Sequence, residues 1–351
     1  MNSLLRPENR CGRCPLAVKY APMPAVRALL PVLAFAVLAC SSSEAILRIY
    51  TSLDPELAST IQKSYRESTG RSFEYVRLST GEALTRIRTE AKRPQAALWL
   101  GGPAIEYGSA APLGLFEPYP PNIDFAIEPP NRDKDWRWTG IYFGVIGFAS
   151  NKAFLKKKGL VPPASWADLL APAYKGQLSY AYPYTSGTAL MIVLGAVAAM
   201  GEEPAYAYFK ALDQQVHHYT KSGSASVNQV GLGEIGVGIA FAQDIQSKGI
   251  DKGYPIELSF PKEGTGYEIG GVGLLRNGTA PELGKKLIDW ILSVEAQEHF
   301  ERWHNTPINP KVVIHPPTVR PGDVKLAPID VAWASENHHR LVDRWRKVTG
   351  K

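Results

Sequence analysis

The chain has 351 residues, of which 45% are hydrophobic and 21% are charged. This apolar content is enough for a large folded core and excludes a disordered chain, and the length suggests about two domains. Much of the net charge of +6 lies in residues 1–39, which hold five basic side chains and one acidic side chain. The remainder is close to neutral, so a basic surface for nucleic acid is not expected.

Residues 1–39 are predicted to be a signal peptide of the lipoprotein type. An apolar stretch follows Arg27 and ends at Val37-Leu38-Ala39-Cys40. About 12 apolar residues are too few to span a bilayer comfortably but fit the core of a signal peptide. A small residue before a cysteine, after such a stretch, resembles the bacterial lipobox, where cleavage leaves a lipid-bearing cysteine. An ordinary cleaved signal and a retained helix are the alternatives to a lipid anchor at Cys40, and Met23 is an alternative start.

The next part of the chain alternates between predicted strands and predicted helices. Strands are predicted at 46–50, 73–78 and 96–100, and helices at 55–69 and 81–91. Alternation at this spacing favours a parallel α/β architecture. Residues 112–135, rich in proline, asparagine and acidic residues, are predicted to form a surface loop.

The apolar segment 140–150 is predicted to carry the chain into a second lobe. Strands are predicted there at 178–182, 216–219, 235–240 and 256–260, and helices at 166–170, 186–200, 204–212 and 225–230. A β-like segment at 269–275 leads back, before helices at 281–292 and 295–303 and a proline-rich tail at 307–328. We therefore expect an α/β fold of two hinged lobes, residues 45–140 plus 266–335 and residues 141–265, with a ligand site in the cleft between them.

Turns rich in serine, threonine and glycine follow several of the predicted strands. The turn at 184–188 precedes a long apolar helix, where free backbone N–H groups, hydroxyls and the helix dipole favour an anion. Ligands of open α/β sheets bind beyond the carboxyl ends of the strands, so turns at these ends are predicted to share one site. The candidate residues are Thr51, Ser52, Gly101, Gly102, Ser186, Gly187, Thr188, Ser222 and Ser224. Each turn alone is also compatible with an ordinary helix cap.

Two acidic residues and three tyrosines are further candidates. Asp244 follows an apolar segment, and Glu268 precedes one. Both could accept hydrogen bonds from hydroxyl or amine groups of a ligand, or both could be solvated surface carboxylates. Tyr180, Tyr182 and Tyr184 alternate along one predicted strand and so share a face. That face could be a ligand-facing aromatic wall or part of the core.

Six motifs give the chain a resemblance to a known family. They are IYTS (49–52), WLGGP (99–103), YTSGTAL (184–190), KSGSA (221–225), GEIGVGIAFAQD (233–244) and PKEGTGYEIGGVGLL (261–275). From about residue 46 to 310 the chain resembles extracytoplasmic solute-binding proteins of ABC importers, in the ferric-binding-protein-like group. The resemblance implies a two-lobed periplasmic-binding-protein fold of type II and a receptor that hands its solute to a permease in the cytoplasmic membrane.

The resemblance also implies the kind of ligand. Ferric members use tyrosine phenolates, often an adjacent pair after the GE-x-x-x-G-I strand, where this chain reads AFAQD at 240–244. The chain is more similar to the branch that binds phosphorylated sugars or phosphonates. That similarity implies a non-enzymatic protein in which Asp244 and Glu268 read the organic part of the ligand. The residues that would cradle the anion are Ser52, Gly102, Ser186, Gly187, Thr188 and Ser224.

Two alternatives to the phosphorylated or phosphonate solute stay open. One is ferric iron held by Tyr180, Tyr182 or Tyr184, and the other is an exported enzyme acting on phosphate esters. An enzyme would need a nucleophile–base pair or a metal cluster, and the sequence shows neither at convincing spacing. For the main hypothesis we expect no cofactor or metal, no nucleic-acid partner, a monomer, and a location in the periplasm or on the outer face of the membrane, anchored through lipid at Cys40.

Overall fold

The strands of the computed structural model form one mixed sheet. The structure describes residues 46–351, so the predicted signal segment and Cys40 lie outside the described part. The main strand order is β2-β1-β3-β10-β5-β8-β6-β7, and β4, β9 and β11 pair at its sides. The strands are β1 (Leu47–Thr51), β2 (Phe73–Arg77), β3 (Leu98–Pro103), β4 (Phe116–Glu117), β5 (Thr139–Asn151), β6 (Leu178–Ala181), β7 (Val216–Thr220), β8 (Val237–Phe241), β9 (Ile256–Ser259), β10 (Tyr267–Leu275) and β11 (Thr306–Pro307).

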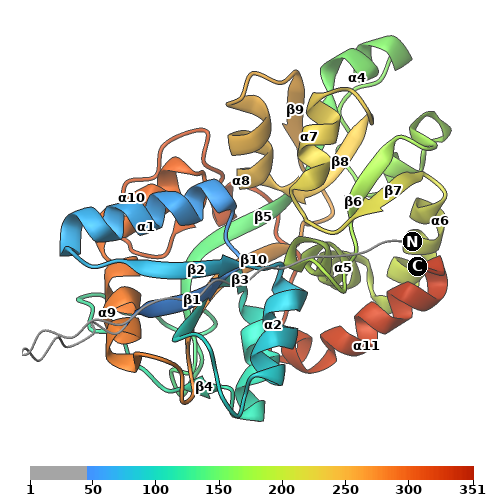
Figure 1. Cartoon of the computed structure of the whole chain (residues 1–351). Coiled ribbons are helices and arrows are strands. Elements are labelled where there is room, and N and C mark those ends of the chain that lie inside the picture. The colour runs from blue at the N-terminus through green and yellow to red at the C-terminus, as the bar shows by residue number, and fades with distance from the viewer. Residues whose placement is uncertain (1–45) are drawn as a thin grey trace, which may run out of the picture. The chain divides into compact units, whose positions relative to one another are not determined.

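The long strand β5 divides this sheet into two halves. Its residues 139–145 pair with β10, and its residues 146–150 pair with β8. Half A contains β2, β1, β3, β10, β4, β11 and the first part of β5. Half B contains the second part of β5 with β6, β7, β8 and β9. Figure 1 shows β5 running from one group of strands to the other; the lobe boundaries predicted from the sequence stay a prediction.

Each half contains a parallel unit. In half A, β1 pairs in parallel with β2 and β3, and in half B, β6 pairs in parallel with β7 and β8. The strands β5 and β10 run antiparallel to their neighbours. The serine-, threonine- and glycine-rich segments predicted as site turns lie at or after the carboxyl ends of β1, β3, β6 and β7.

Helices connect and cover these strands. They are α1 (Pro55–Thr69), α2 (Thr80–Thr89), α3 (Ala104–Ala110), α4 (Lys152–Lys158), α5 (Gly187–Met200), α6 (Glu202–Asp213), α7 (Ala225–Gly231), α8 (Ala242–Asp244), α9 (Pro281–Ile291), α10 (Val294–Arg302) and α11 (Val331–Thr349), with a π-helix, η4 (Ile245–Ile250). In the described part, no helix is both long enough and apolar enough to cross a membrane.

Most of the predicted elements are present in the structure. The prediction of α1 needed only local signals, because Asp54 caps its first turn, Pro55 opens it and Gly70 ends it in a left-handed conformation. The helix predicted at 166–170 is only a short 3₁₀ turn, η2 (Ala167–Leu170). The helices α4, α8, η4 and α11 were not predicted from the sequence.

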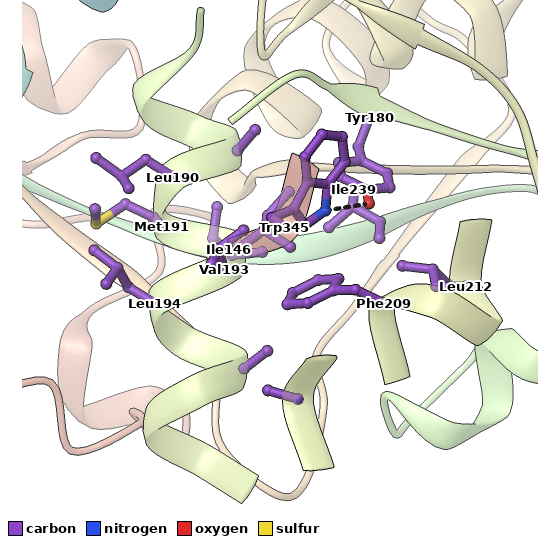
Figure 2. Packing of buried hydrophobic residues seen from close by; sticks show 14 of the residues in the cluster. Ile146, Tyr180, Leu190, Met191, Val193, Leu194, Phe209, Leu212, Ile239 and Trp345 are labelled. Carbon is purple, nitrogen blue, oxygen red and sulfur yellow. Dashed lines mark hydrogen bonds between the residues drawn. The ribbon is translucent and has the colours of Figure 1, made fainter. Parts of the chain in front are cut away.

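The C-terminal helix α11 belongs to the core of half B. Trp345 is fully buried against α5, α6 and the strands of that half, and its indole N–H donates to the Tyr180 hydroxyl at 3.3 Å (Figure 2). The other end of α11 packs on α3, which follows β3 of half A. This helix therefore contacts elements of both halves.

Replacing Trp345 with phenylalanine is expected to lower the free energy of unfolding by about 2 kcal/mol. The smaller ring leaves a cavity in the core, and the Tyr180 hydroxyl loses its hydrogen-bond donor. Urea unfolding monitored by circular dichroism would measure it. Trp333 lies on the same helix but is 40% exposed, so Trp333→Phe is the matched control with a change within about 0.5 kcal/mol. Equal effects of the two substitutions would contradict the core position of Trp345.

Candidate ligand-binding cleft

A cleft with a volume of about 90 Å³ is lined by turns from both halves of the sheet. In half A, lining residues lie after β1, at and after the end of β2 and at the end of β3, and in half B they lie at the ends of β6, β7 and β8 or after them. Of the residues predicted from the sequence, Ser52, Gly102, Ser186, Gly187, Thr188, Ser222, Ser224, Asp244 and Glu268 line this cleft. The volume is room for several water-sized groups, which suits a small solute.

Thr51 and Gly101 lie behind the lining residues. The Thr51 hydroxyl is fully buried, donates to the carbonyl of Leu100 at 3.0 Å and accepts from the amide of Leu53 at 3.2 Å. Gly101 has a φ of +83°, and a Cβ there would lie 2.8 Å from the Leu53 side chain. Thr51 therefore supports the position of Ser52 after β1, and Gly101 supports the position of Gly102 at the end of β3.

The N-terminus of α5 is the centre of the hydroxyl-rich wall. Ser186 occupies the N-cap position, yet its side chain makes no capping hydrogen bond to the helix. Its hydroxyl and the first amides of α5 are thus available to a ligand in the cleft. A Cβ on Gly187 would lie 2.5 Å from Pro103, and a Cβ on Gly223 would overlap the Thr188 hydroxyl. These two glycines allow turns from both halves to approach α5 closely.

Two cationic side chains at the cleft were not singled out as site residues from the sequence. Arg77 is the last residue of β2, and Lys221 directly follows β7; both line the cleft and are exposed. Ser79 and Thr80, at the start of α2, also line it. The sequence carried a usable signal, because Ser79-Thr80-Gly81 follows a strand as the other turns do. The cations add an electrostatic attraction for an anion.

A pair of buried acidic residues occupies another part of the cleft. Burial, followed by the negative charge of Asp244, raises the pKa of Glu268 to about 8. Burial likewise raises the pKa of Asp244. The amide of Gln243 donates to Glu268 at 3.4 Å. At neutral pH Glu268 therefore carries a proton, and the pair can both donate and accept hydrogen bonds.

The three tyrosines of the iron hypothesis do not form one site. Tyr180 is fully buried in the cluster that Figure 2 draws, and burial is the main reason its pKa is raised above the ordinary value. Tyr182 and Tyr184 stack on each other with ring centres 5.0 Å apart, and Arg346 lies over the Tyr184 ring. Within residues 46–351 the cleft is lined by a single tyrosine, Tyr142. The same range shows no group of three histidine, cysteine, aspartate or glutamate side chains placed to hold a metal.

The sheet topology and the cleft define the class of protein. Two parallel α/β units, linked by antiparallel strands, present helix-opening turns to one small polar cleft, which is the arrangement of a periplasmic binding protein. Residues 107–325 match the family described as bacterial extracellular solute-binding protein. The chain belongs to this family, and the fold and class predicted from the sequence are confirmed.

Relatives and solved structures agree with this assignment. An uncharacterized protein of Haemophilus influenzae is 32% identical over 320 residues, which are 88% of this chain and 92% of that protein. A Salmonella typhi protein named "Putative 2-aminoethylphosphonate-binding periplasmic protein" is 29% identical over 67% of this chain and 68% of its own length. The periplasmic binding protein AfuA from Actinobacillus pleuropneumoniae, solved with fructose-6-phosphate bound, superimposes with a TM-score of 0.83 at 31% identity, covering 88% of this chain and 99% of AfuA.

A more distant structure shares the fold alone. The ferric binding protein from Campylobacter jejuni superimposes with a TM-score of 0.73 at 21% identity, covering 86% of this chain and 99% of that protein. These comparisons favour the solute-binding hypothesis over the iron hypothesis. The family description, AfuA and the Salmonella relative all name binding proteins.

Proposed function

We propose that this protein captures a small phosphorylated or phosphonate solute in the cleft and does not transform it. The observation that carries the proposal is the convergence of hydroxyl- and glycine-rich turns from both halves of the sheet on one cleft that two cations also line. Backbone amides at helix N-termini, hydroxyls and cationic side chains are the groups that bind a phosphate or phosphonate.

In this proposal the anionic group of the solute contacts the hydroxyl- and glycine-rich turns. Ser186, Gly187 and Thr188 contribute the start of α5, and Ser52 and Gly102 contribute the opposite wall. Lys221, which directly precedes the Ser222–Ser224 turn, supplies positive charge. A doubly charged group gains most from this combination, because backbone amides, hydroxyls and a cation all favour negative charge.

In this proposal the organic part of the solute contacts Asp244 and Glu268. Because Glu268 is protonated at neutral pH, the pair can hydrogen-bond sugar hydroxyls without further change. An ammonium group in the same place would instead favour the charged form of both carboxyls and would release a proton on binding. Titration calorimetry at pH 7 in buffers of different ionisation enthalpy distinguishes the two: a hydroxylated solute releases no proton and an aminophosphonate about one.

The names of the relatives support both kinds of solute. AfuA is described with fructose-6-phosphate bound, and the Salmonella relative by 2-aminoethylphosphonate. By the same similarity we propose delivery to the permease of an ABC importer and a periplasmic location. That the protein acts as a monomer is a further part of the proposal. A lipid anchor at Cys40 is part of the proposal and is tested by mass spectrometry of the protein extracted from membranes.

Ligand binding is expected to raise the thermal stability of the purified protein. A solute at about 100 times its Kd stabilises the folded state by roughly 2.7 kcal/mol. A thermal-shift panel of glucose-6-phosphate, fructose-6-phosphate, 2-aminoethylphosphonate and inorganic phosphate, each at millimolar concentration, measures this effect. Unphosphorylated glucose and fructose are the matched controls. Equal shifts with and without the phosphate group, or no shift at all, would contradict an anion site.

Loading the protein with ferric citrate separates the iron hypothesis from this one. Tyrosinate bound to iron absorbs visible light, so a coloured protein that retains iron after desalting would overturn the proposal. Turnover of a generic phosphate ester that is abolished by Ser186→Ala would instead establish an enzyme. We expect neither result.

A further inference from the structure

A lysine next to the cleft joins the two halves of the sheet. Lys248 lies in the π-helix η4, which follows β8 of half B, and its ammonium forms an ion pair with the carboxylate of Asp54 at the start of α1 in half A. The same ammonium donates to the Ser224 hydroxyl at 2.8 Å. Asp54 and Ser224 both line the cleft. Lys248 therefore connects a cleft residue of one half to a cleft residue of the other.

We propose that Lys248 is a positioning residue that makes the contribution of Ser224 to anion binding depend on contact between the two halves. This inference rests on the proposed function. A serine hydroxyl has one proton to donate and accepts through its oxygen. Because Lys248 already donates to that oxygen, the Ser224 proton is left to donate to an acceptor in the cleft, and an anionic solute is such an acceptor.

Asp54 holds Lys248 from the other half. Its carboxylate accepts the amide of Glu56 at 2.9 Å, which fixes it at the start of α1. The Lys248 and Asp54 side chains are only 20% and 11% exposed, so water and salt screen this pair less than a surface pair. The contacts run from α1 through Asp54 and Lys248 to Ser224, and they are complete only when the two halves are in contact.

Two further contacts attach the same segment to half A. Lys252 lies 3.4 Å from Glu56, with side chains 52% and 63% exposed. Asp251 lies 2.7 Å from the imidazole of His304, whose neighbours Trp303 and Asn305 line the cleft. An exposed pair such as Lys252–Glu56 contributes little. Lys252 therefore provides a matched control: the same residue type, four positions along the chain, paired with the same helix α1 but without a contact to the cleft.

The experiment measures affinity and dissociation rate for the members of the phosphate and phosphonate panel that wild-type protein binds. Lys248→Met is expected to weaken binding about ten- to hundredfold through faster dissociation. This is the effect of losing a hydrogen bond to a charged group, here the one from the Ser224 hydroxyl to the anionic solute. Lys248→Arg keeps the charge and the donor and should recover most of the affinity. Lys252→Met should leave affinity and dissociation rate unchanged. Circular dichroism and thermal unfolding establish that each variant is folded.

A double substitution tests whether Lys248 acts through Ser224. If it does, Lys248→Met added to Ser224→Ala costs little more than Ser224→Ala alone, because the hydroxyl that Lys248 orients is already gone. Additive losses would overturn the inference, as would unchanged binding by folded Lys248→Met protein or equal losses in the Lys252→Met control. Wild-type protein that binds none of the probes would overturn the proposed function together with this inference, and so is distinguishable from a failure confined to Lys248.

Discussion

Replacing Thr188 with glutamate is expected to abolish binding of a phosphorylated or phosphonate solute. Thr188 is 9% exposed and lines the cleft in the first turn of α5. A carboxylate there places negative charge beside the anion and fills part of a small cavity. Like charges brought together in a binding site cost several kcal/mol, so the affinity should fall by about a thousandfold or more. Isothermal titration calorimetry with the strongest ligand of the panel would measure the loss.

Three variants separate the effect of charge from an effect on folding. Thr188→Ser keeps the hydroxyl and should bind nearly as well as wild type. Thr279→Glu places the same side chain at an exposed position before α9 and should leave binding unchanged. Ser52→Asp repeats the charge test from half A, where Trp99 donates to the Ser52 hydroxyl at 3.0 Å and can donate to a carboxylate as well. Folded Thr188→Glu protein with normal affinity would place the site elsewhere.

Local sequence signals were sufficient for most of the fold. The helix α5 was predictable because a hydroxyl-rich turn and a long apolar run are adjacent in the chain. The helix α11 was not predicted, because its buried residues, among them Leu341 and Trp345, stand in a strongly charged segment whose partners are α3, α5 and α6. The π-helix η4 was also missed: its sequence contains a glycine, and Asp244 at its N-cap makes no side-chain capping hydrogen bond.

The candidate site was predictable to the extent that it is built from strand ends. The end of β3 and the turns after β1, β6 and β7 carry the signal in consecutive residues, and residues of each line the cleft. The sequence could not tell that Ser52 and Gly102 line the cleft while Thr51 and Gly101 do not, because this depends on the conformation of the backbone at each strand end. Contacts between distant segments, such as the ion pair of Asp54 with Lys248, could not be predicted from the sequence either.

The buried carboxyl of Glu268 makes a second large effect measurable without any ligand. Glu268 lies in the buried strand β10, and burial followed by the charge of Asp244 raises its pKa from 4.5 to about 8. The unfolded chain loses this proton near pH 4.5, whereas the folded chain keeps it until about pH 8. The folded state therefore binds more protons in this window, and the free energy of unfolding must fall as the pH rises. The stabilisation is fully present below pH 4.5 and is lost as the pH rises through 8.

Glu268→Gln is expected to remove this pH dependence. Glutamine keeps the shape of the protonated carboxyl and cannot ionise, so the variant and wild type should be similarly stable at pH 4.5. By pH 8.5 the ligand-free variant should be the more stable, by roughly 3 to 5 kcal/mol, because wild type must then bury a charge next to Asp244. Urea unfolding at several pH values measures the difference, and Glu234→Gln, at an exposed position, is the control. Stability curves that stay parallel from pH 4.5 to 8.5 would show that Glu268 is ionised in the folded protein. In that case the carboxyl pair at the cleft carries two negative charges at neutral pH and would favour an aminophosphonate over a sugar phosphate.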